Sequence, residues 1–329
     1  MTKRVLVTGA TGGLGRVLVP VLHDNGFEVM ATGRRSEIGA GLERDSVTFR
    51  AADLTRDALE LLTVGVDTVF HLAALSAPWG RRSAFVQANV TATRRLLDAA
   101  AASGCRRFIY VSTPSIYTDT RHQLGLTETS PLPARWVNDY AETKYVAERL
   151  VIAAARAAMA TVVLRPRAIV SPFDNVLLPR LLRAARRGTL VLPEGGAALV
   201  ELSDARDVVS ALLSARDRAF AVNGAVFNIS GGAPLRVAEI ATLVFRALGQ
   251  PLRIRSISAS AALRLATIAE TVARVLPGRP EPPLTRYSAM IASWSQTFDL
   301  AGARSGLGWR PIHSPQSALT WALAARRHA

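Results

Sequence analysis

A glycine-rich segment near the start of the chain limits the fold more than any other feature of its 329 residues. Residues 5–7 are a short apolar run typical of a buried strand, and Thr8-Gly-Ala-Thr-Gly-Gly-Leu-Gly15 follows at once, before an apolar helical pattern. In such a turn Gly9 permits the tight bend, Gly12 lets the backbone approach a pyrophosphate, and Gly15 lets helix and strand pack closely. The phosphates would lie at the helix N-terminus, where free amides and the helix dipole favour an anion. The predicted dinucleotide contacts in this turn are Gly9, Thr11, Gly12, Gly13, Leu14 and Gly15.

The end of the second predicted strand, residues 27–32, indicates which dinucleotide is preferred. NAD-binding proteins usually carry an acidic side chain here, which binds the ribose 2′-hydroxyl. This chain has Gly33 followed by Arg34 and Arg35, and two guanidinium groups suit a 2′-phosphate. We therefore expect NADP(H) as the cofactor, with NAD(H) as the alternative; two solvated arginines in an arginine-rich chain are the competing interpretation. Asp53, at the end of the third predicted strand, is placed to meet the adenine.

Strand and helix patterns alternate along the chain. Further helical patterns cover 83–102 and 138–159, and further strand patterns lie at 47–54, 66–74, 108–113, 161–166 and 225–230. Strands that are separated by helices pair in parallel, because each crossover returns the chain to the same edge of the sheet. The prediction is an α/β fold with a Rossmann doubly wound parallel sheet of about seven strands.

The pair Tyr140 and Lys144 is the candidate chemical centre. A spacing of four residues puts both side chains on one face of a helix. Only two of the 40 basic residues are lysines, so a lysine at this place indicates a task for a compact ammonium group. One such task is to lower the pKa of the neighbouring phenol from about 10, so that it donates a proton near neutral pH. For the pair taken alone, a surface Tyr/Lys pair on an amphipathic helix is the alternative interpretation.

Composition excludes several classes of protein. The net charge is +15, but the arginines are scattered in pairs without a basic block, so nucleic-acid binding is not expected. No run of 18 uncharged apolar residues occurs, so stable membrane insertion is not expected either. The first residues lack signal-peptide features and the single cysteine, Cys105, excludes an internal disulfide, so we expect a cytoplasmic protein. No metal ligands are predicted.

In combination, these motifs resemble the extended short-chain dehydrogenase/reductase superfamily, which includes nucleotide-sugar epimerases and 3β-hydroxysteroid dehydrogenases. The matching motifs run in family order: Thr8-Gly-Ala-Thr-Gly-Gly-Leu-Gly15, Asp53-Leu54, His71-Leu-Ala-Ala74, Asn89, Val111-Ser-Thr113, Tyr140-Ala-Glu-Thr-Lys144, Arg165-Pro166, Asp204-Ala-Arg-Asp207 and Leu307-Gly-Trp-Arg-Pro311. The resemblance implies that Tyr140 is the proton donor, that Lys144 holds the nicotinamide ribose and tunes the tyrosine, and that Thr113 hydrogen-bonds the substrate oxygen. The cofactor contacts that it adds are Leu54, Leu72, Ala73, Ala74, Asn89, Tyr140, Lys144 and Pro166.

The resemblance also implies a second, smaller and mostly helical lobe that binds the substrate. The expected Rossmann domain is 1–166 plus about 206–231, and the substrate lobe is about 167–205 and 232–329. The helical pattern at 259–276 and the proline-rich turn after it resemble the 3β-hydroxysteroid dehydrogenase group and the bacterial 2-alkyl-3-oxoalkanoate reductases. The predicted substrate contacts are Ser76, Trp79, Ser115 and Tyr287. The helical side chains expected to wall the cleft are Ala261, Leu263, Leu265, Ile268, Val272 and Leu276.

Among the functions in this superfamily, we expect a reductase or dehydrogenase that acts on a ketone or secondary alcohol of a relatively apolar substrate, either free or attached to an acidic carrier. A nucleotide-sugar epimerase is the alternative, although residues 293–299 lack the arginine that commonly binds the diphosphate. A dehydratase is disfavoured because Pro114 and Ser115, rather than an acidic pair, follow Thr113. A non-catalytic sensor is disfavoured because the catalytic triad of the family, Thr113, Tyr140 and Lys144 in this chain, is complete. A homodimer is left open.

Overall fold

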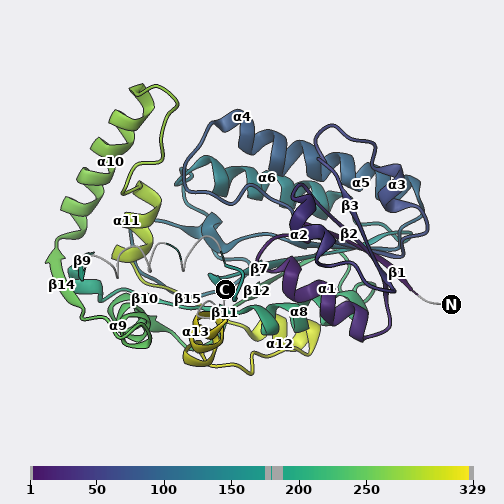
Figure 1. Ribbon diagram of the computed structural model, residues 1–329. Helices are drawn as coiled ribbons and strands as arrows, with labels where there is room; N and C mark the ends of the chain where they lie inside the picture. Colours follow the sequence, from purple (N-terminus) through teal and green to yellow (C-terminus); the bar gives the residue numbers. More distant parts are fainter. Residues whose placement is uncertain (1–2, 175–178, 180–187, 326–329) are drawn as a thin grey trace.

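The chain folds around a seven-stranded parallel sheet (Figure 1). The computed structural model describes residues 3–174, 179 and 188–325. The strand order across the sheet is β12-β7-β5-β4-β1-β2-β3, and all neighbouring pairs are parallel. The strands are β1 (Arg4–Thr8), β2 (Glu28–Gly33), β3 (Val47–Ala51), β4 (Thr68–His71), β5 (Arg107–Val111), β7 (Ala160–Pro166) and β12 (Ala225–Ile229). This order confirms the predicted Rossmann doubly wound fold.

The strand order reverses at β1, which pairs with β2 on one side and with β4 on the other. Residues 5–7 of β1 are completely buried because helices cover both faces of the sheet. In an open α/β sheet, such a reversal leaves a crevice at the carboxyl ends of the strands, and ligands bind there. The glycine turn follows β1 and residues 72–74 follow β4, so both segments lie at this edge.

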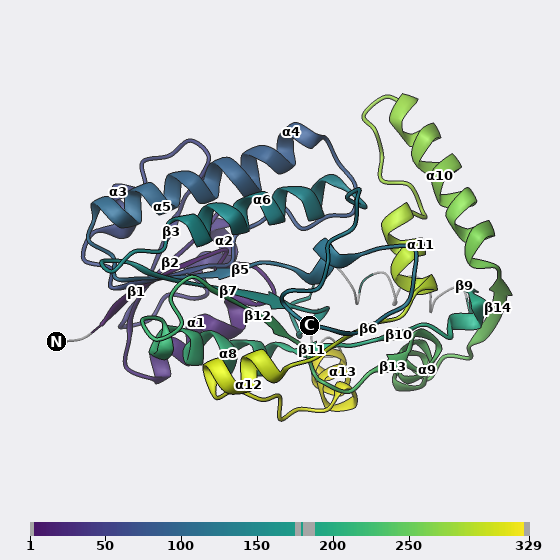
Figure 2. The same ribbon diagram turned by 180° about the vertical axis from the view of Figure 1, so that it is seen from behind.

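Helices cover both faces of the sheet, and each face has its own hydrophobic core (Figures 1 and 2). Leu18 and Leu212 pack with Ile109 in one cluster, whereas Leu96 packs with Phe108 in the other, because neighbouring residues of a strand point to opposite faces. The helices of the first face are α1 (Gly15–Asp24), α8 (Ala205–Arg218) and α12 (Ala301–Leu307). Those of the second are α3 (Glu60–Thr63), α4 (Arg82–Phe85), the π-helical turn η1 (Val86–Thr91), α5 (Ala92–Ala102) and α6 (Asp139–Ala153).

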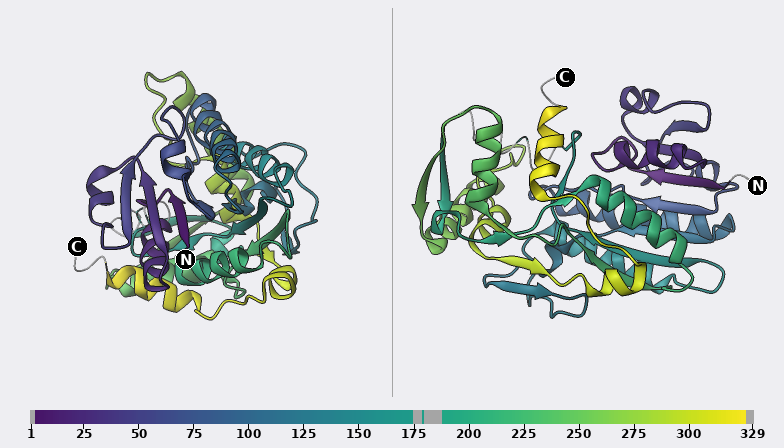
Figure 3. Two further views of the ribbon diagram at one scale, coloured as in Figure 1. Left: turned by 90° about the vertical axis from the view of Figure 1, so that its right-hand side faces the viewer. Right: turned by 90° about the horizontal axis from the view of Figure 1, so that it is seen from below.

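A second group of elements lies beyond the carboxyl edge of the main sheet, at the end of the molecule opposite the N-terminus (Figures 1 and 3). Its four-stranded sheet has the order β13-β10-β15-β6, and two further strand pairs are β8 with β11 and β9 with β14. The strands are β6 (Gln123–Leu126), β8 (Ile169–Val170), β9 (Thr189–Pro193), β10 (Leu199–Val200), β11 (Ser203–Asp204), β13 (Leu235–Arg236), β14 (Arg253–Ile257) and β15 (Gln296–Phe298). The helices are α9 (Val237–Ala247), α10 (Ala259–Val275), α11 (Arg286–Ser293) and α13 (Pro315–Ala324), and α10 packs against α11.

Short elements complete the chain: α2 (Ser36–Ala40), and the 3₁₀ turns η2 (Pro114–Tyr117) and η3 (Glu194–Gly196). The helix predicted at 138–159 ends earlier, at Ala153, because a turn closed by a 3.1 Å hydrogen bond from Arg156 N to Met159 O leads into β7. The domain boundaries stay predictions, and residues 175–178 and 180–187 of the expected second lobe lie outside the described residues. None of the helices in the described part of the chain has the length and apolar run that crossing a bilayer requires.

Candidate active site

The glycine turn packs tightly against the backbone that follows β4. Gly9 has a φ of +68°, and a Cβ atom there would lie 2.8 Å from the amide nitrogen of Ala73. A Cβ atom on Gly15 would lie 2.4 Å from the carbonyl oxygen of Gly9, so α1 approaches β1 as closely as the sequence predicts. Thr11 and Leu14 are buried beneath the turn. A larger residue at Gly9 or Gly15 would move the turn away from the edge of the sheet where the strand order reverses. The close packing of these glycines therefore fits the backbone cradle that a dinucleotide pyrophosphate requires.

Three arginines, Arg16, Arg34 and Arg35, lie near Gly33 at the end of β2. A Cβ atom on Gly33 would lie 2.8 Å from Thr11 Oγ1, so the position has no room for an acidic side chain unless Thr11 shifts. The guanidinium of Arg35 donates a hydrogen bond to the carbonyl oxygen of Thr11. Arg16, in the first turn of α1, lies close by: partial burial, followed by the charge of Arg35, lowers the pKa of Arg16. Arg34 is exposed to solvent.

The predicted adenine contact, Asp53, is held by its own loop. Its Oδ1 atom accepts hydrogen bonds from the amide nitrogen of Thr55 at 3.0 Å and from the hydroxyl of Thr55 at 2.7 Å. These two bonds lower the pKa of Asp53, so the carboxylate is charged at neutral pH. Leu54 is buried, and Arg95 of α5 donates a 2.6 Å hydrogen bond to its carbonyl oxygen. The loop after β3 is therefore fixed in position.

Asn89 connects the loop after β4 to α6. Its Oδ1 atom accepts a 2.8 Å hydrogen bond from the amide of Leu75, and its Nδ2 atom donates to Leu75 O at 3.3 Å and to Thr143 Oγ1 at 3.1 Å. Asn89 is buried in the π-helical turn η1, a kind of irregularity that is frequent at functional sites. Because its amide binds Leu75 on one side and Thr143 on the other, Asn89 holds the segment 72–75 against α6, and its contact with the cofactor stays a prediction.

Tyr140 and Lys144 lie on α6, whose first turn is capped by Asn138. The Asn138 side chain accepts a 2.9 Å hydrogen bond from the amide of Ala141. This bond caps the helix, whose first residue is Asp139. The hydroxyls of Ser76 and Thr113 are hydrogen-bonding neighbours of the Tyr140 phenol. The structure thus brings the predicted substrate contact Ser76 together with Thr113 and Tyr140, two members of the predicted catalytic triad.

Lys144 is directed at the sheet. Its Nζ atom donates a 2.6 Å hydrogen bond to Val111 O and lies 4.1 Å from the centre of the Tyr110 ring. Burial lowers the pKa of Lys144 to about 7, although the Glu148 carboxylate offsets part of this effect. Burial also raises the pKa of Tyr140, against the opposite effect of its hydrogen bonds with the hydroxyls of Ser76 and Thr113. Lys144 is not among the groups that shift the pKa of Tyr140 in this structure, so the expectation that Lys144 lowers this pKa stays a prediction.

A buried ion pair supports the strand end that carries Thr113. Glu148 accepts hydrogen bonds from Ser112 Oγ at 2.7 Å and from Arg165 Nε at 3.0 Å, and the three side chains are almost completely buried. Arg165 also donates to the hydroxyl of Tyr117. Removing one partner of such a pair leaves an uncompensated buried charge, which is strongly destabilising. Glu148 and Arg165 therefore fix the position of residues 112–113 relative to α6, and Pro166 follows at the end of β7.

Hydroxyl groups continue from Thr113 to the second lobe. Thr113 Oγ1 donates a 3.0 Å hydrogen bond to Ser115 Oγ and accepts a 3.2 Å bond from the amide of Ser115. Ser115 Oγ lies 2.8 Å from the hydroxyl of Tyr287 on α11, and Tyr287 in turn hydrogen-bonds to the side chain of Arg167. The predicted substrate contacts Ser115 and Tyr287 thus meet beside Thr113.

The comparisons with known proteins agree with this arrangement. A model of the NAD dependent epimerase/dehydratase family matches residues 5–230. The chain belongs to this family. It is 35% identical to the uncharacterized protein YbjS of Escherichia coli, covering 94% of this chain and 93% of that protein. The 2-alkyl-3-oxoalkanoate reductase of Stenotrophomonas maltophilia is 34% identical, with 96% and 97% covered. The 4-hydroxy-2-methyl-3-oxo-4-farnesyl-3,4-dihydroquinoline-1-oxide ketoreductase of Stigmatella aurantiaca is 31% identical, with 93% and 91% covered.

Solved structures of related proteins share the whole fold. The structure of MoeE5 in complex with UDP-glucose and NAD has a TM-score of 0.76 and 28% sequence identity, and 99% of each chain is covered. The epimerase Mth375 from Methanothermobacter thermautotrophicus has a TM-score of 0.81 with 99% of this chain and 93% of that chain covered, and at 19% identity it supports the fold alone. These comparisons support a nucleotide cofactor for the family, and the glycine turn described above is the candidate cradle for it.

Trp79, a predicted substrate contact, connects the part of the chain around the main sheet to the second group of elements. Its indole Nε1 donates a 3.0 Å hydrogen bond to the carbonyl oxygen of Arg279, 200 positions away, and the guanidinium of Arg274 lies 5.6 Å from its ring centre. Trp79 thereby holds the loop after β4 against the loop after α10. Nothing brings its side chain to Thr113 or Tyr140 among the contacts of the described residues.

The expected role of α10 as a cleft wall is wrong. Leu265, Ile268 and Val272 are 54%, 61% and 50% exposed, whereas the buried residues of α10 are Ala262, Ala266, Glu270 and Ala273. The small residues face α11, because their short side chains let the two helices pack closely. The apolar pattern of α10 therefore marks an outward face, and α11 with Tyr287 lies nearer to the candidate site (Figure 1).

Three residues that contribute to the site were missed from the sequence: Arg16, Arg167 and Ser171. Arg16 directly follows the last glycine of the motif, which is the one signal that could have identified it. The Ser171 hydroxyl donates a 3.2 Å hydrogen bond to the carbonyl oxygen of Gly13, so the segment after β8 is tied to the glycine turn. Nothing in the local sequence around Arg167 or Ser171 indicates these contacts, which depend on how the second lobe packs.

Proposed function

We propose that this protein is an NADP-dependent reductase or dehydrogenase that interconverts a ketone and a secondary alcohol on a relatively apolar substrate. The observation that carries the proposal is the meeting of the Tyr140 phenol with the hydroxyls of Thr113 and Ser76 at the switch-point edge of the sheet. Reduction of a ketone requires one hydride on carbon and one proton on oxygen. The bound nicotinamide cofactor supplies the hydride from its C4 atom.

The chain's own residues handle the proton. Because the pKa of Tyr140 is raised, its phenol is protonated at neutral pH and donates to the substrate oxygen as the alcohol forms. The hydroxyl of Thr113 orients that oxygen, and Lys144 holds the ribose and the strand end. Positioned proton transfer of this kind typically accelerates a reaction by about 10²–10⁴-fold. In the direction of oxidation, the same phenol oxygen takes the proton from the alcohol.

The charge beside Gly33 supports NADP(H) as the preferred cofactor, with NAD(H) as the alternative. Arg16 and Arg35 lie near each other where a ribose 2′-phosphate would reach, and each could form charge-assisted hydrogen bonds with it. Gly33 offers no carboxylate to the 2′-hydroxyl that would favour NAD(H). Arg34, which the sequence suggested equally with Arg35, is also exposed, whereas Arg16 is partly buried.

A nucleotide-sugar epimerase is the second candidate, because MoeE5 was solved with UDP-glucose and NAD. The reductase is favoured by the names of the relatives at 34% and 31% identity, a 2-alkyl-3-oxoalkanoate reductase and a quinoline-oxide ketoreductase. It is also favoured by the residues after Thr113, where Pro114 and Ser115 offer no second acid or base. A dehydratase, which needs such a pair, is disfavoured for the same reason.

A substrate screen tests this proposal. Purified protein is incubated with NADPH and either hydrophobic β-keto and cyclic ketones or a set of UDP-sugars. We expect NADPH oxidation with at least one ketone and no conversion of the sugars. Conversion of a UDP-sugar without net consumption of cofactor would transfer the function to the epimerase candidate. Activity with neither set would contradict both.

A further inference from the structure

Helix α10 carries an aliphatic stripe that faces away from the rest of the protein. Five side chains of the helix and its C-cap recur three or four residues apart, so they share one side of the helix over about three turns. They are Leu265, Ile268, Val272, Val275 and Leu276, with exposed fractions of 54%, 61%, 50%, 80% and 45%. Single exposed leucines are normal on a protein surface, but a contiguous apolar strip of this length marks an interaction site.

The opposite side of α10 is already used for packing. Ala262 and Ala266 pack on Ala289 of α11. The carboxylate of Glu270 accepts a 2.7 Å hydrogen bond from the amide of Arg286, in the first turn of α11. These contacts fix α10 at the edge of the molecule with the aliphatic stripe turned outward (Figures 1 and 2).

An apolar groove extends the stripe at the C-terminal end of α10. It has a volume of about 310 Å³ and lies between the helix and the proline-rich turn that follows. Its lining is Ala269, Val272, Ala273, Leu276, Pro280, Glu281, Pro282 and Pro283. Trp79 fixes this turn, because its indole donates a 3.0 Å hydrogen bond to the carbonyl oxygen of Arg279. Since hydrocarbon groups form both walls, an aliphatic chain in the groove would bury apolar surface against each.

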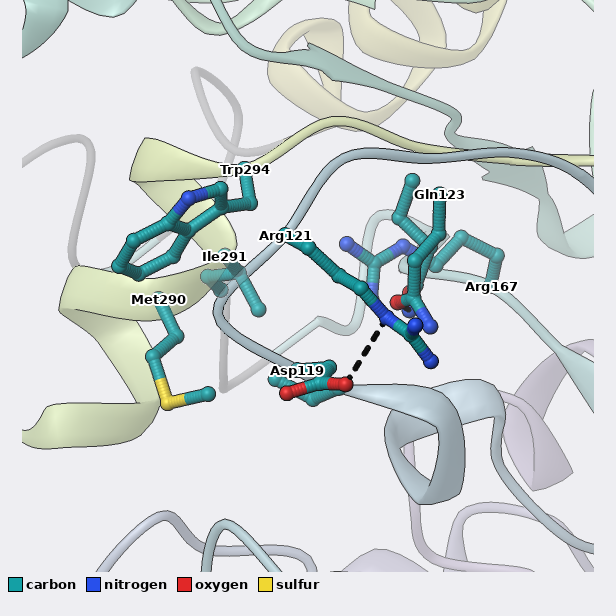
Figure 4. Close-up of a pocket in the computed structure, with 9 residues that line it drawn as sticks. Asp119, Arg121, Gln123, Arg167, Met290, Ile291 and Trp294 are labelled. Carbon is teal, nitrogen blue, oxygen red and sulfur yellow. Dashed lines mark hydrogen bonds and ion pairs between the residues drawn. The ribbon is translucent and has the colours of Figure 1, made fainter. Parts of the chain in front are cut away.

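The pocket beside α11 has the opposite character (Figure 4). Arg121, Gln123 and Arg167 border it, and Arg121 Nε forms a 3.0 Å ion pair with Asp119. Its volume is about 10 Å³, close to the minimum for one water molecule. This pocket suits water rather than a hydrocarbon chain, so of the two hollows it is the groove on α10 that fits an apolar ligand.

Positive charge surrounds the stripe and the groove. Residues 253–286 contain six arginines and two glutamates. One glutamate, Glu270, is buried and lies 3.6 Å from Arg274, which leaves Glu281 as the exposed acid of this segment. Arg264 is exposed one helical turn before Ile268, so its long side chain can reach past the stripe. Exposed aliphatic side chains flanked by arginines complement a boundary that is apolar on one side and anionic on the other.

A second copy of the chain fits this surface less well than a lipid bilayer does. A copy would bring the same arginines, and the single carboxylate of α10 is already buried. Another protein is also less suited, because binding energy at protein interfaces is concentrated in Trp, Tyr and Arg side chains, whereas the stripe is aliphatic. A bilayer surface supplies both the anionic charge and the hydrocarbon.

We propose that the outer side of α10 docks on the surface of a membrane that contains anionic phospholipids. The aliphatic stripe enters the boundary between headgroups and acyl chains, and one acyl chain occupies the groove beside the proline-rich turn. The helix lies along the surface and does not cross the bilayer. The net charge of +15 adds long-range attraction to an anionic surface. This docking is reversible, goes beyond the proposed function and does not depend on it.

Co-sedimentation with lipid vesicles tests the proposal. Full-length protein is mixed with vesicles of phosphatidylcholine that contain about 30% phosphatidylglycerol, or with vesicles of phosphatidylcholine alone. We expect binding to the anionic vesicles at about 1 mM lipid, roughly ten times the concentration at which a single myristoyl chain is half bound. Raising NaCl from about 0.1 M to about 0.5 M should weaken this binding several-fold, because salt screens the charges.

Variants of the stripe separate docking through α10 from attraction by net charge alone. Leu265→Gln/Ile268→Gln keeps the charge and should lower the partition coefficient by about tenfold or more. Arg264→Gln should lower it by about fivefold. The matched control is Leu61→Gln/Ile312→Gln, since these two side chains are 56% and 78% exposed but lie on α3 and before α13. The control should change the partition coefficient by less than about twofold. Equal urea midpoints would show that all four proteins are folded.

Three results would overturn the proposal. The first is no binding of the wild type to anionic vesicles at about 1 mM lipid. The second is an equal loss of binding in the stripe variant and in its control, which would assign the binding to net charge. The third is a wild-type dimer that becomes monomeric in Leu265→Gln/Ile268→Gln when measured by sedimentation velocity, because a second copy would then cover the stripe.

Discussion

The hydroxyls of Ser115 and Tyr287 lie 2.8 Å apart although the residues are separated by 172 positions. Ser115 belongs to the turn after β5, next to Thr113, and Tyr287 belongs to α11. This contact is where the second lobe meets the proposed reaction centre. It links Thr113, which we propose orients the substrate oxygen, to the predicted substrate lobe, so we expect chemistry and selectivity to depend on the same few hydroxyl groups.

Replacing Tyr140 by Phe should abolish turnover and spare cofactor binding. The phenol hydroxyl is the proposed proton donor, and such groups typically contribute about 10²–10⁴-fold, so kcat should fall by at least a hundredfold. The Kd for NADPH should change by less than about threefold, because the cradle is built from the glycine turn. Steady-state assays and fluorescence titration measure the two quantities.

The control for this variant is Tyr145→Phe, which removes a phenol hydroxyl from the same helix α6 where its ring stacks on Trp136. It should retain most of the wild-type rate. If Tyr140→Phe keeps more than about a tenth of the activity, the proton comes from another group.

Cofactor preference should depend on Arg16 and Arg35. Each charge-assisted contact to a 2′-phosphate is worth about 1.5–3 kcal/mol, so Arg16→Ala or Arg35→Ala should weaken NADPH binding by about ten- to a hundredfold and leave NADH binding nearly unchanged. Arg246→Ala, on the exposed face of α9, is the matched surface control. Isothermal titration with both cofactors measures the effect, and equal affinities of the wild type for NADPH and NADH would remove the basis of this prediction.

Much of the fold could be predicted because it depends on local pattern. The glycine motif after β1 and the alternation of strands with helices predict the parallel sheet, and a spacing of four residues places Tyr140 and Lys144 on one face of α6. These features need only the nearest neighbours in the chain. The strand pattern at 108–113 placed Thr113 at the end of a strand, but its assignment to the site came from the resemblance to the family.

Contacts between distant segments could not be predicted in this way. The apolar pattern of α10 correctly indicated an amphipathic helix, but a pattern does not say which face another element covers, and α11 covers the alanines rather than Leu265 and Ile268. The pKa of Tyr140 depends on how completely the surrounding lobe removes water from the phenol, which no local spacing reveals. Arg167 gives no signal in sequence because its importance comes from burial.

Lys144 should make the stability of the protein depend on pH. Burial lowers its pKa to about 7, whereas the unfolded chain has a lysine pKa of about 10.4, so between these values the unfolded state binds the extra proton. Unfolding free energy contributed by this group therefore rises with pH from about 7 to about 10, by up to about 1.4 kcal/mol per pH unit. The difference between wild type and Lys144→Met, measured by urea unfolding at pH 7, 8 and 9, isolates this effect. A difference that is constant over this range would show that Lys144 stays charged.

Finally, the contact between Ser115 and Tyr287 should appear as a coupling energy in catalysis. A hydrogen bond between neutral groups is worth about 0.5–1.5 kcal/mol, so Ser115→Ala and Tyr287→Phe should each lower kcat/KM by about two- to twelvefold. Because both variants remove the same bond, the double variant should lose less than the sum of the two effects, with a coupling energy of about 0.5 kcal/mol or more. Unfolding free energies measured on the same four proteins separate loss of catalysis from loss of fold. Strict additivity of the two effects on kcat/KM would mean that the two hydroxyls act independently, and that α11 approaches Thr113 without contributing to its position.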